Sequence, residues 1–401
     1  MRGFFSGSEL KSEKITPKIS RCGKCGLYKK CISPKMQTTG LGRRKTLFVA
    51  EAPGEQEDRQ GVQLIGDAGQ LLRDVLDDID IDLDDCWKTN TVICRPPNNK
   101  IEKHMIQCCR PNLLKTIKRL RPAVIIALGK SALESLLFQE WKKDIGPLTK
   151  WIGWTIPSPQ YKAWLCPTYH PSYILRMGED ELLVKIFRQH LKKAISLENK
   201  KVKKYSLENL KSKVEVILDP DHARTRMANL STKEGVLAFD YETNGLKPDK
   251  KGHKIISVSF CLNGKDTFAC GIDEDHRTKS VLSDILKSKH LKKVASNMKF
   301  EERWTRAILG HGVKSWYWDT MLAAHCLDNR SGISSIKFQA YIHLGLSDYD
   351  SHIAPYLYGK NSNGFNRIDQ IDPKELLIYN GIDSLTEYMI MKRQRKIFNG
   401  K

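Results

Sequence analysis

The sequence contains no long hydrophobic run. Its longest purely apolar stretch covers residues 123–128, whereas a helix that crosses a membrane needs roughly 20 apolar residues. The N-terminal segment MRGFFSGSELKSEK becomes polar before an apolar segment develops, so we expect no secretory leader. The sequence therefore predicts a protein without membrane association, located in the cytoplasm.

Acidic residues are few compared with basic ones. The 401 residues include 67 Lys and Arg but only 46 Asp and Glu, which gives a formal net charge of +21. Both halves share this excess, which indicates a polyanionic partner such as nucleic acid; a solvated lysine-rich surface is the alternative. With 40% hydrophobic and 28% charged residues, the chain is neither disordered nor collagen-like, and its length suits two domains.

The 11 cysteines are unevenly distributed, because most lie between residues 22 and 166. In a cytosolic chain, such a group favours metal ligation over disulfide bonds. Cys22 and Cys25 form a close pair, while Cys94 and Cys109 are dispersed. This pattern is compatible with a 4Fe-4S cluster or with zinc, and buried cysteines without a ligand are a third possibility.

The first half alternates short apolar strands with helical patterns, which predicts a parallel sheet between two layers of helices, a three-layer α/β/α domain. The second half begins with strands and is mostly helical from residue 281 onward, which predicts a mixed sheet with packed helices. A charged, weakly apolar stretch separates the two. We therefore predict domains over residues 1–195 and 214–401, joined by a linker over residues 196–213.

Five motifs follow one another in the first half of the chain: EAPGEQEDRQG (51–61), AGQLL (68–72), TNTVICRPP (89–97), IIALGKSAL (125–133) and TYHPSYILR (168–176). In sequence and in order they resemble family 4 uracil-DNA glycosylases. The resemblance implies that Cys22, Cys25, Cys94 and Cys109 hold a 4Fe-4S cluster; Cys108 is adjacent, but Cys109 precedes Arg-Pro as the family ligand does.

The resemblance also implies a glycosylase-like pocket. Uracil excision requires a flipped base, recognition of its edge and stabilisation of the charge that develops. By the resemblance, Asn90 reads the uracil edge, His170 stabilises the oxyanion and Glu51 positions the attacking water. The sequence departs from the family at Leu64. The family has an aromatic residue there, which stacks on the base, and leucine loses about 1–3 kcal/mol of this stacking energy.

Two neighbouring departures affect the surface of this domain. Asp67 stands where a basic residue is expected, and Ala50 where the family has glycine. An acid near the DNA would repel phosphate. These differences favour a cluster-bearing domain that binds DNA or a partner over one that excises uracil.

In the second half, carboxylates follow a pattern typical of a metal site. The strand VLAFDYETNGL places Asp240 and Glu242 on one sheet face, and such a pair is costly unless cations neutralise it. Tyr379 and Asp383 have helical i, i+4 spacing, and Glu301 lies near the start of another helix. Surface salt bridges are the alternative interpretation.

Together these segments resemble the three motifs of DEDDy 3'-5' exonucleases, especially the proofreading domain of the DNA polymerase I family, which implies a ribonuclease H-like fold. The segments WDTMLAAHCLDNR (318–330) and SIKFQAYIHLGLSDYDS (335–351) also resemble bacteriophage replication exonucleases. The resemblance implies two Mg²⁺ or Mn²⁺ ions bound by Asp240, Glu242 and Asp383. It also implies that Glu301 completes the acidic shell and that Tyr379 orients the attacking water. The family usually has Asp at position 301, so we expect altered efficiency rather than loss of activity.

The sequence thus predicts a metal-dependent 3'-5' DNA exonuclease fused to a glycosylase-like iron-sulfur domain, acting in DNA replication or repair. Because the chain ends soon after the third exonuclease motif, we expect a separate DNA polymerase as a partner, with DNA strands or 3' ends as substrate. One alternative is a bifunctional enzyme that also excises uracil. Another is a non-catalytic replisome module that holds DNA or polymerase.

Overall fold

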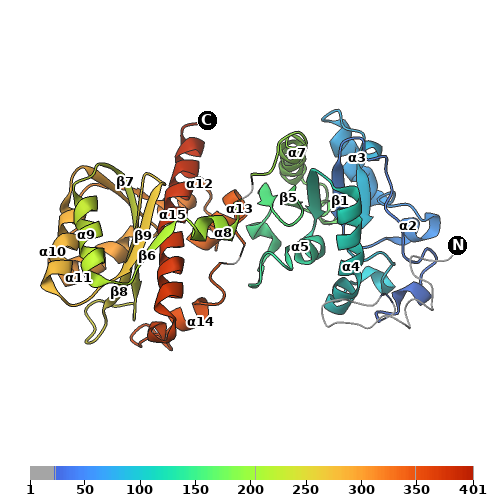
Figure 1. Ribbon diagram of the computed structural model, residues 1–401. Helices are drawn as coiled ribbons and strands as arrows, with labels where there is room; N and C mark the ends of the chain where they lie inside the picture. The colour runs from blue at the N-terminus through green and yellow to red at the C-terminus, as the bar shows by residue number, and fades with distance from the viewer. Residues whose placement is uncertain (1–21, 23, 204, 348, 401) are drawn as a thin grey trace. The chain divides into compact units, whose positions relative to one another are not determined.

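Two α/β units make up the chain, one up to residue 204 and one from residue 205 (Figure 1). The computed structural model describes residues 22, 24–203, 205–347 and 349–400. Helix α8 (Leu207–Lys211) lies within the stretch predicted as a linker, and its Leu210 packs in the core of the second unit. The exact domain bounds stay a prediction.

The first unit is built on a five-stranded sheet in the order β2-β1-β3-β5-β4. Its four longer strands are parallel, and only the edge strand β4 pairs in the antiparallel direction. The central strands are buried along their whole length, as expected for a sheet covered on both faces. The strands are β1 (Thr46–Ala50), β2 (Trp87–Asn90), β3 (Val124–Leu128), β4 (Ile156–Ser158) and β5 (Ala163–Thr168).

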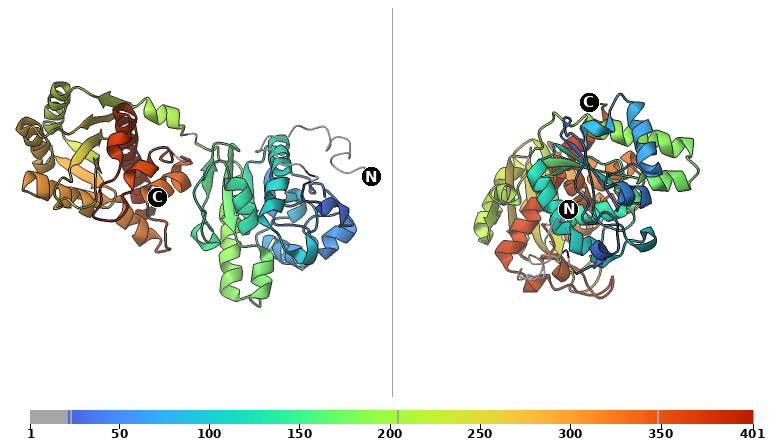
Figure 2. Two further views of the ribbon diagram at one scale, coloured as in Figure 1. Left: turned by 90° about the horizontal axis from the view of Figure 1, so that it is seen from below. Right: turned by 90° about the vertical axis from the view of Figure 1, so that its right-hand side faces the viewer.

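Helices cover both faces of this sheet, which confirms the predicted three-layer arrangement (Figures 1 and 2). One layer contains α3 (Asp67–Asp77), α6 (Pro171–Arg176) and α7 (Glu181–Ile195), and the other α4 (Lys103–Leu120) and α5 (Lys130–Leu137). The main core of the unit lies on one face of the sheet, where apolar residues of the strands pack against those of α3, α6 and α7. The short helix α2 (Glu55–Gln60) follows β1.

The second unit contains a six-stranded mixed sheet in the order β11-β10-β7-β8-β9-β6. The neighbours β7, β8 and β9 are antiparallel, while β6, β10 and β11 join in the parallel direction. Two of these strands, β10 and β11, lie in the stretch for which mostly helices were expected. The strands are β6 (Val214–Ile217), β7 (Gly235–Thr243), β8 (Ile255–Leu262), β9 (Asp266–Gly271), β10 (Leu291–Ala295) and β11 (Trp316–Asp319).

The long helix α15 (Pro373–Phe398) crosses one face of this sheet, where it contacts strands from β6 to β10 (Figure 1). Leu237, Phe239 and Tyr241 of β7 pack in the core on the opposite face, whereas Ala238 belongs to the core that includes α15. Because side chains alternate along a strand, Asp240 and Glu242 face α15. The remaining helices are α9 (Pro220–Ser231), α10 (His276–Lys287), α11 (Met298–Leu309), α12 (Thr320–Leu327), α13 (Ile336–Leu344) and α14 (Ala354–Leu357).

No helix in the described part of the chain combines the length and the apolar character that crossing a membrane demands.

Candidate active sites

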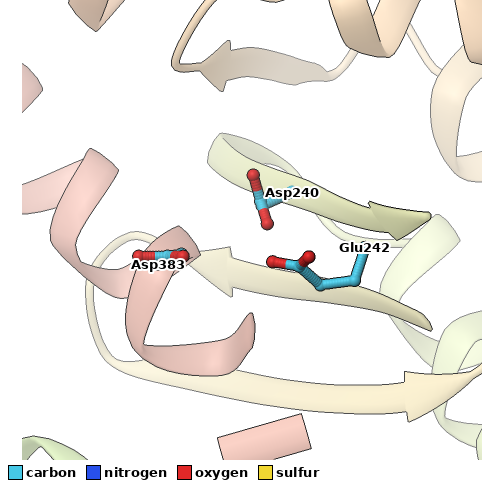
Figure 3. A group of neighbouring side chains, drawn as sticks. All are labelled: Asp240, Glu242 and Asp383. Atoms are coloured by element: carbon cyan, nitrogen blue, oxygen red, sulfur yellow. The ribbon is translucent and has the colours of Figure 1, made fainter. Parts of the chain in front are cut away.

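Three carboxylates meet between β7 and α15. Asp240, Glu242 and Asp383 each offer one oxygen, and these atoms lie within 4.8 Å of one another (Figure 3). Asp240 and Glu242 come from one face of β7, and Asp383 comes from the helix that crosses that face. The structure therefore brings together the three residues for which metal binding was predicted.

Burial makes this arrangement electrostatically costly. Desolvation, with repulsion from Asp383, raises the pKa of Asp240 to about 8. Desolvation also raises the pKa of Glu242 well above its ordinary value, and Asp240 adds to this effect. Like charges at this distance require a cation to neutralise them. Oxygen donors in a close group are the ligands that Mg²⁺ and Mn²⁺ prefer, so the donor set fits divalent ions.

Side chains absent from the sequence prediction hold this group in place. Lys337 Nζ and Tyr349 Oη both donate to Asp383 Oδ1, the tyrosine at 2.7 Å. Asn380 Nδ2 donates to Asp240 Oδ2 at 2.8 Å. Asn380 follows Tyr379 directly in the third motif, so its position could have indicated a role. Lys337 and Tyr349 lie between the motifs, where no spacing singles them out.

Tyr379 is buried on α15, one turn before Asp383. Its ring centroid lies 6.3 Å from that of Tyr349. Burial, together with the charge of Asp383, raises the pKa of the Tyr379 hydroxyl well above its usual value. The hydroxyl therefore stays protonated at neutral pH and is suited to a hydrogen bond with a water or phosphate oxygen.

Two further glutamates lie in the same region. Glu301, in the first turn of α11, is buried, and its Oε2 has no hydrogen-bond partner within the described residues. Glu387 follows Asp383 by one helical turn; it accepts a hydrogen bond from Ser296 N at 2.9 Å, and Oε2 is also without a partner. Burial and the charge of Asp240 raise the pKa of both carboxyls. The i, i+4 spacing from Asp383 could have identified Glu387 in the sequence.

The predicted glycosylase-like residues gather at the carboxyl edge of the first sheet. Glu51 follows β1, Asn90 ends β2, and His170 lies between β5 and α6. A Cβ atom added to Gly129 would lie 2.7 Å from Glu51 Oε1 and 3.2 Å from His170 Cβ, so these two side chains flank the same glycine. Burial lowers the pKa of His170, which favours the neutral ring.

Asn90 is buried, and Gln63 fixes one end of its amide. Asn90 Nδ2 donates to Gln63 Oε1, while Gln63 Nε2 donates to Gln37 O at 3.1 Å. Asn90 Oδ1 is buried with no partner among the described residues. Leu64, by contrast, packs in the core beside Leu71, so its side chain is not exposed as a stacking surface.

The predicted cluster ligands lie near one another in a separate small core. Cys94 and Cys109 are buried there, Cys25 packs against it, and Cys22 is buried close by. Burial raises the pKa of the Cys109 thiol to about 12, and the neighbouring Cys25 and Cys22 add to the effect. Lys35 N donates to Cys94 Sγ at 3.2 Å. Such an amide bond is typical of the sulfurs of iron-sulfur centres.

This group of thiols fits a metal cluster better than disulfide bonds. All the described cysteines are free, and thiolates in so buried a place require a cation. Cys108 also lies near Cys25, and Cys31 lies near Cys94. The structure therefore supplies more thiols than the predicted cluster needs.

The fold and the two sites define a nucleic-acid-processing enzyme with a glycosylase-like unit and a 3'-5' exonuclease unit. Residues 39–195 match the model of the uracil DNA glycosylase superfamily, and residues 214–348 match the 3'-5' exonuclease model of the DNA polymerase A type. Through its N-terminal half, the chain belongs to the type-4 uracil-DNA glycosylase family. Both resemblances seen in the sequence are thereby confirmed.

Individual relatives agree with this assignment. The type-4 uracil-DNA glycosylase of Saccharolobus solfataricus is 37% identical over 169 residues, which cover 40% of this chain and 76% of that protein. For the Thermotoga maritima enzyme, the identity is 36%, with 42% and 86% covered. A DNA polymerase of Bacillus phage SP01 is 24% identical over 355 residues, which cover 79% of this chain but only 36% of the polymerase.

Solved structures resemble the chain over about half of its length. The catalytic core of RRP6 from Trypanosoma brucei has a TM-score of 0.37 at 13% identity and covers 47% of each chain. Escherichia coli RNase D has a TM-score of 0.36 at 12% identity and covers 47% of this chain and 45% of its own.

Proposed function

We propose that the protein removes nucleotides from the 3' ends of DNA in a reaction that needs two divalent metal ions. The observation that supports this most directly is the buried group of Asp240, Glu242 and Asp383, with Tyr379 one turn away on the same helix. Such a group has a high electrostatic cost, and a role in binding ions between the protein and a phosphodiester accounts for it.

The residues of the site divide the work of phosphodiester hydrolysis. Asp240, Glu242 and Asp383 would hold the ions, which activate water and stabilise the leaving 3' oxygen when bound. The Tyr379 hydroxyl orients the attacking water. Burial and the nearby charge of Asp240 raise the pKa of Glu301, and the unpartnered oxygen of Glu301 is suited to a water molecule of a hydrated ion. Because Glu301 has a longer side chain than the Asp usual at this position, we expect it to change the rate of hydrolysis rather than abolish the reaction.

A strand-degradation assay tests this proposal. A single-stranded DNA labelled at its 5' end should shorten stepwise when the protein and Mg²⁺ or Mn²⁺ are present, because hydrolysis starts at the unlabelled 3' end. A chelator should stop the reaction, and added metal should restore it. A strand that stays intact at all metal concentrations would contradict the proposal.

We further propose that a 4Fe-4S cluster is bound by Cys22, Cys25, Cys94 and Cys109, and that a separate DNA polymerase works with the protein. The cluster is supported by the group of buried, free thiols. The polymerase partner is supported by the similarity to the SP01 DNA polymerase, which extends over both units of this chain. Joint purification of the two proteins, and faster removal of mismatched 3' ends in their presence, would test the partnership.

Recognition of uracil is a second candidate function of the first unit. The unpartnered Asn90 Oδ1 favours it, because a buried acceptor requires a donor. Uracil offers N3–H at the corresponding edge, whereas N3 of cytosine is itself an acceptor. Gln63 fixes the Asn90 amide so that Oδ1 is the free end.

We expect the protein to bind a single strand that contains one uracil about tenfold more tightly than the same strand with cytosine. Asn90→Ala should remove the difference, while Asn199→Ala, at an exposed position of the same unit, should leave it intact. Fluorescence titration in chelator measures binding without degradation. Free uracil in the mixture would show excision as well, and equal binding of the two strands would contradict the assignment of Asn90.

A further inference from the structure

A lysine side chain lies inside the group of exonuclease carboxylates. The Lys337 side chain is 17% exposed, and its Nζ pairs with Asp383 Oδ1. The same nitrogen lies 4.3 Å from the ring centroid of Tyr349 and 4.4 Å from that of Tyr379. Lys337 therefore contacts both the carboxylate that closes the proposed metal site and the tyrosine that would orient water.

The position of Lys337 in its own helix does not explain its presence. It occupies the first turn of α13, where the helix dipole disfavours a positive charge. The cap of this helix is Ser335, whose hydroxyl accepts a hydrogen bond from Phe338 N. A largely buried cation at this place requires an anionic partner, and Asp383 supplies it.

The contacts of Asp383 leave one of its oxygens available. Among the described residues, both side-chain donors, Lys337 and Tyr349, end on Oδ1. Oδ2 is thus the oxygen suited to a metal ion. The two donors also fix the rotation of the carboxylate, and the neighbouring rings of Tyr349 and Tyr379 restrict where the lysine can go.

We propose that Lys337 is a positioning residue of the exonuclease site, which orients Asp383 and Tyr379 and lowers the affinity of the carboxylates for divalent ions. This inference rests on the metal site proposed above. Loss of the lysine charge leaves three close carboxylates with a greater need for another cation, so metal binding should become tighter. Loss of its contacts leaves Asp383 and Tyr379 less well oriented, so turnover should become slower.

Tighter metal binding together with slower turnover distinguishes this role of Lys337 from a general loss of structure, which would weaken both metal binding and turnover. In full-length Lys337→Met, the Kd for Mn²⁺, measured by calorimetry without DNA, should fall roughly tenfold. The kcat for strand degradation at saturating Mn²⁺ should fall by at least about tenfold. Lys337→Arg retains the charge and should keep a near-normal Kd, with a smaller loss of kcat.

Two further variants complete the test. Tyr349→Phe removes a neutral hydrogen bond to the same oxygen and should leave the Kd near that of the wild type. Lys374→Met, at an exposed position of α15, should change neither quantity. If Lys337→Met does not fold, tighter Mn²⁺ binding by Lys337→Gln supports the proposal and unchanged or weaker binding overturns it.

The outcomes separate this inference from the metal site on which it rests. A wild-type protein that binds no Mn²⁺ would overturn both. Normal binding by the wild type, with unchanged or weaker binding by Lys337→Met, would overturn only the role of Lys337. An unchanged kcat in Lys337→Met would also overturn the role of Lys337.

Discussion

Replacement of Asp240 by asparagine is expected to reduce strand degradation on the order of a thousandfold, which corresponds to about 4 kcal/mol of transition-state stabilisation. Asp240 is central to the site, because its charge adds to the effect of burial in raising the pKa of Glu242, Glu301 and Glu387. Asparagine has the same shape but no charge, so binding of the ions should suffer more than the fold. Single-turnover degradation of a 5'-labelled strand in Mg²⁺ measures the effect.

The design of this variant keeps the local structure. Asn380 donates to Asp240 Oδ2, and the remaining carbonyl oxygen of an asparagine can accept that bond. Asp284→Asn, on the exposed side of α10, is the matched control and should degrade DNA like the wild type. Equal activity of Asp240→Asn and the wild type would show that hydrolysis takes place elsewhere.

The same substitution should change how stability depends on pH in the metal-free protein. The pKa of Asp240 is raised from 3.8 to about 8 by burial, so the folded state favours its protonated form. Its contribution to stability is fully present below about pH 4 and is lost as the pH rises towards 8. In the presence of a chelator, the midpoint temperature of thermal unfolding should therefore fall less steeply with rising pH for Asp240→Asn than for the wild type. Excess Mg²⁺ should raise this midpoint temperature more for the wild type than for Asp240→Asn.

Local spacing predicts which residues of each element share a face in the exonuclease site. The period of a strand places Asp240 and Glu242 on one face, and the period of a helix aligns Tyr379 with Asp383. That the two elements face each other depends on how α15 packs across the sheet. The resemblance to known exonucleases supplied this long-range step, and the periodicity of either segment alone does not contain it.

Other parts of the molecule depend on tertiary packing and left little signal in the sequence. Lys337 reaches Asp383 only because α13 packs against α15, and Tyr349, which follows this helix in the chain, donates to the same carboxylate. Strand β10, with the sequence LKKVA, carries two lysines that obscure its apolar pattern, yet Lys293 is fully buried. Burial lowers the pKa of Lys293 to about 8, and its Nζ donates to Ser288 O. A strand that contains a buried lysine can therefore lie inside the sheet, where β10 is paired on both sides, with β11 and β7.

Among the cysteines, the adjacent pair Cys108 and Cys109 provides the sharpest test of the proposed cluster. Cys109→Ala should lose iron and the visible absorption of the cluster, because this deeply buried thiol belongs to the small core with Cys94. Cys108→Ala should retain both. Loss of the cluster removes binding energy that contributes to folding. In a unit of this size, a loss of about 3 kcal/mol lowers the unfolding midpoint by roughly 6–12 °C, which is the expected change.

Metal analysis and thermal unfolding of protein purified without oxygen measure these effects. Cys166→Ala is a further control, because this thiol is buried in the main core of the same unit rather than in the small core. Loss of iron only from Cys108→Ala would assign the fourth ligand to that residue. Zinc without iron in the wild type would contradict the cluster itself. Because the carboxylate site lies in the other unit, Cys109→Ala should still degrade DNA in Mg²⁺, which would separate the role of the cluster from the chemistry of the exonuclease.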